Sequence, residues 1–161
     1  MAVRGPLVHI DMSVSDPDSS IPFYAAFFEA LGYKRWHYEH PGFTGPNPTH
    51  ATWGVRYPNG ASFAIELRPS QGENRTRPCD RYAPGVHHMA FHAEDAAAVD
   101  QVHAAMVAAG ATVLDPPCDY GEQAGYGKGY YAVFFADPDG AKFEVAHIPS
   151  ANTGPSTQAA P

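Results

Sequence analysis

Two histidines and two glutamates recur at matched positions along the 161-residue chain. His9 and His88 are 79 positions apart, and Glu66 and Glu144 are 78 positions apart. His9 precedes Glu66 by 57 positions, and His88 precedes Glu144 by 56. Such register is typical of an internal repeat. Imidazole nitrogens and carboxylate oxygens that converge on one cavity suit a divalent metal such as Ni, Co, Mn, Fe or Zn, among which these ligand types do not select.

Each of the four residues lies in an apolar segment with the pattern of a strand. Because successive side chains in a strand point to opposite faces, His9 lies opposite Ile10 and Met12, and Glu66 and Glu144 lie opposite the apolar residues on either side of them. A carboxylate between apolar neighbours is costly to bury unless something positive pairs with it. Alone, each residue is more often structural or solvated. As a matched quartet, the four predict a metal site on the concave face of a curved sheet.

The elements that position these residues form two copies of one pattern. Each half begins with a strand, at 7–14 and at 86–93, followed by a helix predicted at 18–31 and at 95–109. Three strands follow each helix, near 33–40, 50–57 and 61–68 in the first half and near 111–115, 129–136 and 141–148 in the second. The predicted fold class is α+β with two βαβββ modules.

The domain boundaries follow from this repeat. The first module covers 6–68, a linker with Pro, Gly and Arg covers 69–84, and the second module covers 85–148. Residues 149–161 are small and polar with further prolines, which predicts a disordered tail.

Composition limits the classes of function. The net charge of −7 argues against a nucleic-acid partner, because binding to phosphates needs basic stripes. No apolar run approaches the length of a membrane span, and the N-terminal residues lack the apolar core of a signal peptide. Cys79 and Cys118 stand apart without a CxxC pair, which fits a reducing cytoplasm better than a disulfide scaffold.

Four segments together resemble a known superfamily. HIDMSVSDPDSSIPFY, FAIEL, HHMAFHAED and FFADPDGAKFEV are similar to the pattern of the vicinal oxygen chelate superfamily. This superfamily includes glyoxalase I, extradiol dioxygenases, methylmalonyl-CoA epimerase and the fosfomycin and bleomycin resistance proteins. The resemblance covers about residues 6–148. It implies a vicinal oxygen chelate (glyoxalase) fold, in which paired modules curl into a mixed β-sheet cup around one divalent metal, with the helices outside.

The resemblance also implies which residues bind the metal. Its ligand positions fall on the first and last strands of each module, here His9 and Glu66, then His88 and Glu144. His87 competes with His88, and the family pattern, with the ligand three positions before an apolar residue, selects His88 because Phe91 follows it. The complete His/Glu/His/Glu set is most similar to bacterial-type glyoxalase I.

The implied reaction is that of a lyase or isomerase. A proton moves through a metal-stabilised enediolate, with Glu144 as the principal base and Glu66 as its partner. The first alternative is an extradiol-type Fe(II) dioxygenase that uses His9, His88 and Glu144, the facial triad of two histidines and one carboxylate. Proton return to the same carbon would give an epimerase. A drug-binding resistance protein ranks last, because the chain keeps all four ligand residues.

Further residues are candidates for binding a small-molecule substrate. Arg68 shares the predicted face of Glu66, His92 shares that of His88, and Tyr130 adjoins a glycine-rich stretch that forms either a lid or a plain surface loop. The arginines in and near the linker either bind an anionic substrate such as glutathione or are simply solvated. A homodimer is expected, and the modules can pair within one chain or across two subunits.

Overall fold

The computed structural model describes residues 7–36, 51–121 and 125–149. Among these residues, contacts divide the chain into two compact units, and each is described by itself. Unit one comprises the residues up to Asp80 together with Asp137–Ala141, and unit two comprises Arg81–Ala136 and the residues from Lys142 onward.

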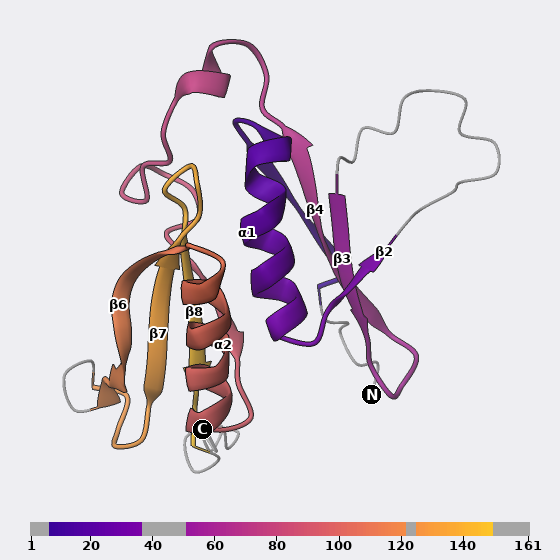
Figure 1. The fold of residues 1–161 in the computed structure, drawn as a ribbon. Coiled ribbons are helices and arrows are strands. Elements are labelled where there is room, and N and C mark those ends of the chain that lie inside the picture. The colour runs from indigo at the N-terminus through magenta and orange to yellow at the C-terminus, as the bar shows by residue number, and fades with distance from the viewer. Residues whose placement is uncertain (1–6, 37–50, 122–124, 150–161) are drawn as a thin grey trace, which may run out of the picture. The chain divides into compact units, whose positions relative to one another are not determined.

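Unit one contains the first βαβββ module. Its elements are β1 (His9–Val14), α1 (Pro17–Ala30), β2 (Lys34–Trp36), β3 (Ala51–Arg56) and β4 (Ser62–Pro69), followed by the 3₁₀ helix η1 (Gly72–Thr76). The sheet order is β1-β4-β3-β2. β1 pairs with β4 in parallel, and the other neighbours are antiparallel. In Figure 1, α1 lies along this sheet.

Helix α1 is held to its sheet by aromatic side chains. The Asp16 side chain caps the first turn by accepting a hydrogen bond from the Asp18 amide, and Pro17 occupies the first helical turn. Phe28 and Tyr24 are fully buried, and their rings contact Trp53 of β3 at centroid distances of 5.7 and 6.4 Å. The face of the sheet that these rings cover is therefore the core of unit one.

Unit two repeats the same module. Its elements are β5 (Met89–His92), α2 (Ala96–Ala108), β6 (Thr112–Asp119), β7 (Tyr131–Ala136) and β8 (Lys142–His147), in the order β5-β8-β7-β6. β5 pairs with β8 in parallel. The Asp95 side chain caps α2 by accepting a hydrogen bond from the Ala98 amide at 2.7 Å. The predicted α+β fold class with two βαβββ modules is confirmed.

Some predicted boundaries differ from those observed. β5 begins at Met89 rather than near 86, so His88 lies just before the strand, because pairing with β8 starts at Met89 and Phe143. β6 extends to Asp119, beyond the predicted end near 115, because two register shifts let it continue along β7. Part of the predicted strand at 33–40 and nearly all of the predicted tail at 149–161 lie outside the described residues. No helix in the described part of the chain is long and apolar enough to cross a membrane.

The turn between β7 and β8, Asp137–Ala141, belongs to unit one, although both strands belong to unit two. The buried Tyr24 hydroxyl of α1 donates to Asp137 Oδ2 at 2.5 Å, and the Ser15 amide donates to Asp139 Oδ2 at 2.7 Å. The Cys79 amide donates to the carbonyl oxygen of Asp139 at 2.9 Å. This turn is therefore anchored by residues that precede the second module.

Candidate metal and substrate site

The polar face of the first sheet carries two of the four predicted ligands. Along β1, His9 and Asp11 are exposed while Ile10 and Met12 are partly covered, so the predicted alternation is observed. The parallel register places Asp11 directly beside Glu66, and Glu66 is mostly buried, with 16% of its side chain exposed. His9 and Glu66 therefore share one face of the sheet.

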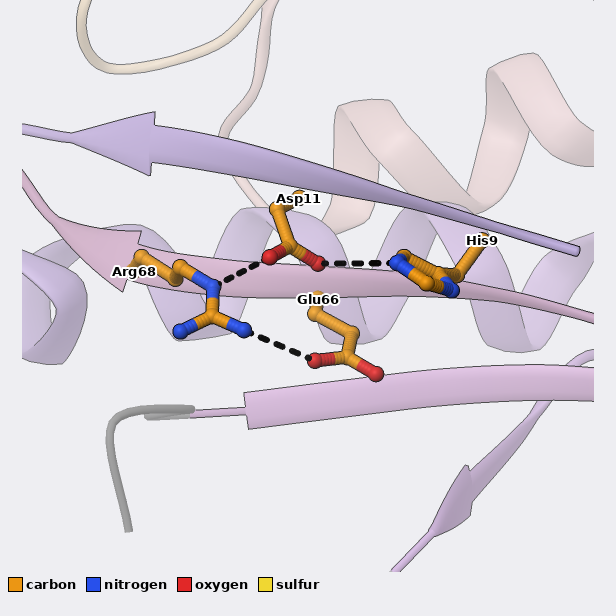
Figure 2. Close-up of polar contacts among 4 residues, drawn as sticks. All are labelled: His9, Asp11, Glu66 and Arg68. Carbon is orange, nitrogen blue, oxygen red and sulfur yellow. Dashed lines mark hydrogen bonds and ion pairs between the residues drawn. The ribbon is translucent and has the colours of Figure 1, made fainter.

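Arg68 lies at one end of this group and reaches both of its carboxylates, as Figure 2 shows. Its Nε donates a hydrogen bond to Asp11 Oδ2, and its Nη2 lies 3.7 Å from Glu66 Oε2. His9 Nε2 is 4.0 Å from the other oxygen of Asp11. The guanidinium thus bridges two carboxylates that repel one another, and Glu66 already has a cationic neighbour.

The second pair of predicted ligands lies together in unit two. Glu144 of β8 is buried, with 4% of its surface exposed, and its Oε2 is 3.1 Å from His88 Nε2. His88 Nδ1 is 2.8 Å from Nδ1 of His87, and the ring of Tyr82 packs edge-on against His87. Of the two adjacent histidines, His88 is the one that meets Glu144.

Tyr130 holds the remaining oxygen of Glu144. Its hydroxyl donates to Glu144 Oε1 at 2.5 Å. Burial, followed by the hydrogen bond and charge of Glu144, raises the pKa of Tyr130 above its ordinary value. The phenol therefore stays protonated at neutral pH and remains a donor. Its ring stacks on Tyr126, with centroids 4.7 Å apart and an interplanar angle of 22°.

A cavity of about 700 Å³ opens beside this pair. The described residues that line it are His88, Ala90, Tyr120, Gly125, Tyr126, Tyr130, Phe134, Lys142, Glu144 and Ile148. A volume of this size is within the range of small-molecule sites. Buried Glu144 thus borders a space that a small molecule can occupy.

Sequence reasoning placed some of these residues and missed others. His88, Glu144 and Tyr130 meet in one group, whereas His92 is exposed on β5 and is not among the described residues that line the cavity. Phe134 and Lys142 were missed, although their positions carried a signal: Phe134 pairs with Glu144 across β7 and β8, and Lys142 precedes Glu144 by two residues on the same face.

The donor set fits a divalent metal, although it forms no complete ligand cluster by itself. Among the described residues, no three His, Cys, Asp or Glu side chains are grouped as a metal site. The 3.1 Å spacing of an imidazole nitrogen and a carboxylate oxygen lets both donors face one cation. His88 and Glu144 therefore fit such a cation directly. Glu66 would first have to break its ion pair with Arg68 before it could bind the cation.

Comparison with known proteins agrees with the fold. The profile of the Glyoxalase/Bleomycin resistance protein/Dioxygenase superfamily matches residues 7–145. The uncharacterized protein YqjT of Bacillus subtilis (strain 168) is 31% identical over 137 residues, which are 85% of this chain and 94% of that protein.

Solved structures share the fold. A candidate glyoxalase from Bacillus halodurans matches with a TM-score of 0.66 at 23% identity, over 89% of this chain and 96% of that chain. A glyoxylase/bleomycin resistance protein/dioxygenase domain from Frankia sp. EAN1pec matches with a TM-score of 0.60 at 21% identity, over 89% and 97% of the two chains.

Proposed function

The chain belongs to the Glyoxalase/Bleomycin resistance protein/Dioxygenase superfamily, and we propose that within it the protein is a divalent-metal-dependent isomerase or lyase that moves a proton at a carbon beside a carbonyl group. The observation that carries the proposal is the buried carboxylate of Glu144, which borders the cavity with His88 at 3.1 Å and Tyr130 at 2.5 Å. A carboxylate withdrawn from water at a cavity wall is suited to act as a general base.

The residues that we propose as ligands are His9, Glu66, His88 and Glu144. A divalent cation bound by them supplies a Lewis acid that polarises the substrate carbonyl and so makes the neighbouring C–H more acidic. Members of this superfamily often bind such a metal. The nitrogen and oxygen donors of this chain match that chemistry.

Glu144 accepts the proton in the proposed reaction. Tyr130 fixes the orientation of the carboxylate by donating to Oε1, which leaves the Oε2 side toward His88. Glu66 is the second carboxylate of the proposed proton transfer. The Arg68 guanidinium balances the charge of Glu66 before the metal binds. Return of the proton to the neighbouring carbon gives an isomerase or lyase of the glyoxalase I kind, and return to the same carbon gives an epimerase.

Solvent-exchange NMR tests the proposal. The protein is loaded in turn with Ni, Co, Mn, Fe(II) or Zn and incubated in D₂O with a panel of small α-hydroxycarbonyl compounds. We expect metal-dependent loss of the substrate C–H signal, and no loss with Glu144→Gln. Oxygen uptake without any hydrogen exchange would overturn the proton-transfer proposal.

A second candidate, an extradiol-type Fe(II) dioxygenase, is favoured by one observation. Because Arg68 already engages Glu66, the donors without a guanidinium contact are His9, His88 and Glu144, the two histidines and one carboxylate that Fe(II) oxygenases use. This candidate requires Fe(II)-dependent oxygen uptake with catechols that survives Glu66→Gln. The isomerase proposal requires that Glu66→Gln lowers the exchange rate.

A further inference from the structure

The cavity beside Glu144 is walled by aromatic rings. Tyr126 and Tyr130 stack on one another, and the ring of Tyr120 meets that of Phe134 edge-on, with centroids 5.4 Å apart. Rings arranged this way offer both faces and edges to a further ring. The lining therefore favours a flat, unsaturated guest over a flexible aliphatic one.

One positively charged side chain, that of Lys142, lies among these aromatic rings. The Lys142 ammonium lies 3.8 Å from the centroid of the Phe134 ring. No hydrogen bond or ion pair to this ammonium is found among the described residues, and Lys142 is the only lysine or arginine that they contribute to the lining. An ammonium held over a ring, beside a cavity, keeps its donors available for an anionic group.

The spacing between Lys142 and Glu144 limits the size of the guest. The two residues are two apart on β8, so their side chains leave the same face about 6.6 Å apart along the strand. This separation is comparable to the width of one substituted benzene ring. A molecule that places its anionic group at Lys142 and its reacting carbon at Glu144 is therefore compact.

We propose that the cavity binds a planar aromatic monoanion, such as an aryl carboxylate, and that Lys142 is the residue that selects it. The proposal rests on the proposed function in taking this cavity as the substrate site. A single cation matches a single negative charge, whereas a glutathione conjugate brings two carboxylates.

Binding of simple probes to the intact protein without added metal tests the inference. Benzoate, its uncharged analogue benzamide and the non-aromatic anion cyclohexanecarboxylate are titrated separately, and dissociation constants are taken from shifts of the backbone amide NMR signals. We expect benzoate to bind at least about tenfold more tightly than benzamide, because only the anion makes the charge-assisted contact with Lys142. It should also bind more tightly than cyclohexanecarboxylate, because only a planar aromatic ring stacks on the rings of the lining. The shifts should be centred on Phe134, Lys142 and Tyr130.

Variants then assign the preference to particular residues. Lys142→Met should remove the preference for benzoate over benzamide, Lys142→Arg should retain it, and Phe134→Leu should reduce the preference for benzoate over cyclohexanecarboxylate. The matched control is Lys34→Met, at an exposed lysine on β2 of unit one, which should leave all three constants unchanged.

Equal binding of benzoate and benzamide by the wild-type protein would overturn the inference, as would equal losses in Lys142→Met and Lys34→Met. These outcomes are independent of the proposed chemistry. Metal-dependent hydrogen exchange that persists without benzoate selectivity would contradict only the substrate class. Selective benzoate binding without any hydrogen exchange would contradict only the proton-transfer reaction.

Discussion

At the residue scale, the proposed function depends on the three-residue contact among Glu144, His88 and Tyr130. A buried carboxylate with a phenol on one oxygen and an imidazole on the other is held in one orientation. Such fixed orientation is what a general base requires, because the barrier to proton transfer depends on geometry as well as on pKa.

Glu144→Gln tests this role. We expect the rate of solvent hydrogen exchange to fall by about 10²–10⁴-fold, the usual contribution of a positioned base, because an amide cannot accept the proton. The control is Glu94→Gln, at an exposed glutamate that follows β5, which should leave the rate unchanged. Metal content is measured in both variants, and a full loss of rate in the control would contradict the assignment.

Arg68 leads to a separate prediction. Because its guanidinium competes with any other cation for Glu66, Arg68→Gln should tighten metal binding, by no more than about fivefold since half-exposed ion pairs are worth about 1 kcal/mol or less. Competition with a coloured chelator measures the change, and Arg77→Gln in the exposed linker is the control. Weaker metal binding in Arg68→Gln would mean that Arg68 positions Glu66 rather than competing for it.

Part of this group could be predicted from the sequence. Alternation along a strand depends only on local geometry, so the shared face of His9 and Glu66 and the side of β8 on which Glu144 lies followed from the residue order. The ion pairs of Arg68 did not follow, because side-chain torsions decide which of several nearby acids a long guanidinium reaches. Lys142 was missed for the same reason: its position over the Phe134 ring depends on its rotamer.

At the element scale, the turn between β7 and β8 is fixed by α1. The carboxylate of Asp137 accepts from the Tyr24 hydroxyl and from the amides of Asp139 and Ala141, which closes the turn on itself and attaches it to the helix. Burial raises the pKa of Asp137, which marks the cost of enclosing this carboxyl group. The AspProAspGly turn was predictable from its residues, whereas its partner 113 positions away was not, because only the tertiary fold brings the two together.

Tyr24→Phe measures the strength of this attachment. We expect the free energy of unfolding to fall by about 1.5–3 kcal/mol at pH 7, since a buried charged acceptor loses a donor. Burial, then the negative charge of Asp137, raises the pKa of Tyr24 in the folded protein. A phenol that binds its proton more tightly when folded stabilises fully below its unfolded pKa of about 10, and this contribution is lost as the pH rises further.

Urea denaturation of both proteins across pH 7 to 11 makes the measurement. The difference between wild type and Tyr24→Phe should be largest at neutral pH and shrink above about pH 10. Tyr82→Phe, at a tyrosine that is 83% exposed, serves as the control and should lie within 0.5 kcal/mol or so of wild type. A difference that grows with pH would contradict the account of Tyr24.

At the scale of the whole molecule, the two units repeat one topology and present similar edges. β1 and β5 each lie at the edge of their own sheet, and apolar residues before them are exposed: Leu7 and Val8 before β1, and Val86 before β5. Edge strands with exposed apolar neighbours favour association with another surface. We therefore predict that the protein is a homodimer.

Light scattering after gel filtration tests the dimer, whose mass should be twice the 17.3 kDa of one chain. Val8→Ser should shift the population toward the monomer. Val107→Ser, at a similarly exposed valine on α2, should not. A monomeric wild-type protein, or dissociation caused by Val107→Ser, would contradict this use of the edge strands.

The central claim is that one divalent metal is bound through both pairs of ligands, and metal stoichiometry tests it most directly. The protein is equilibrated with Ni, Co, Mn, Fe(II) or Zn, dialysed without chelator and analysed by mass spectrometry of the elements, beside the single alanine variants of His9, Glu66, His88 and Glu144. We predict about one metal per chain in the wild type and a clear loss of affinity in every variant, with His92→Ala unchanged. A wild-type protein that retains no stoichiometric metal, or any one of the four alanine variants that retains it as fully as the wild type, would contradict the account.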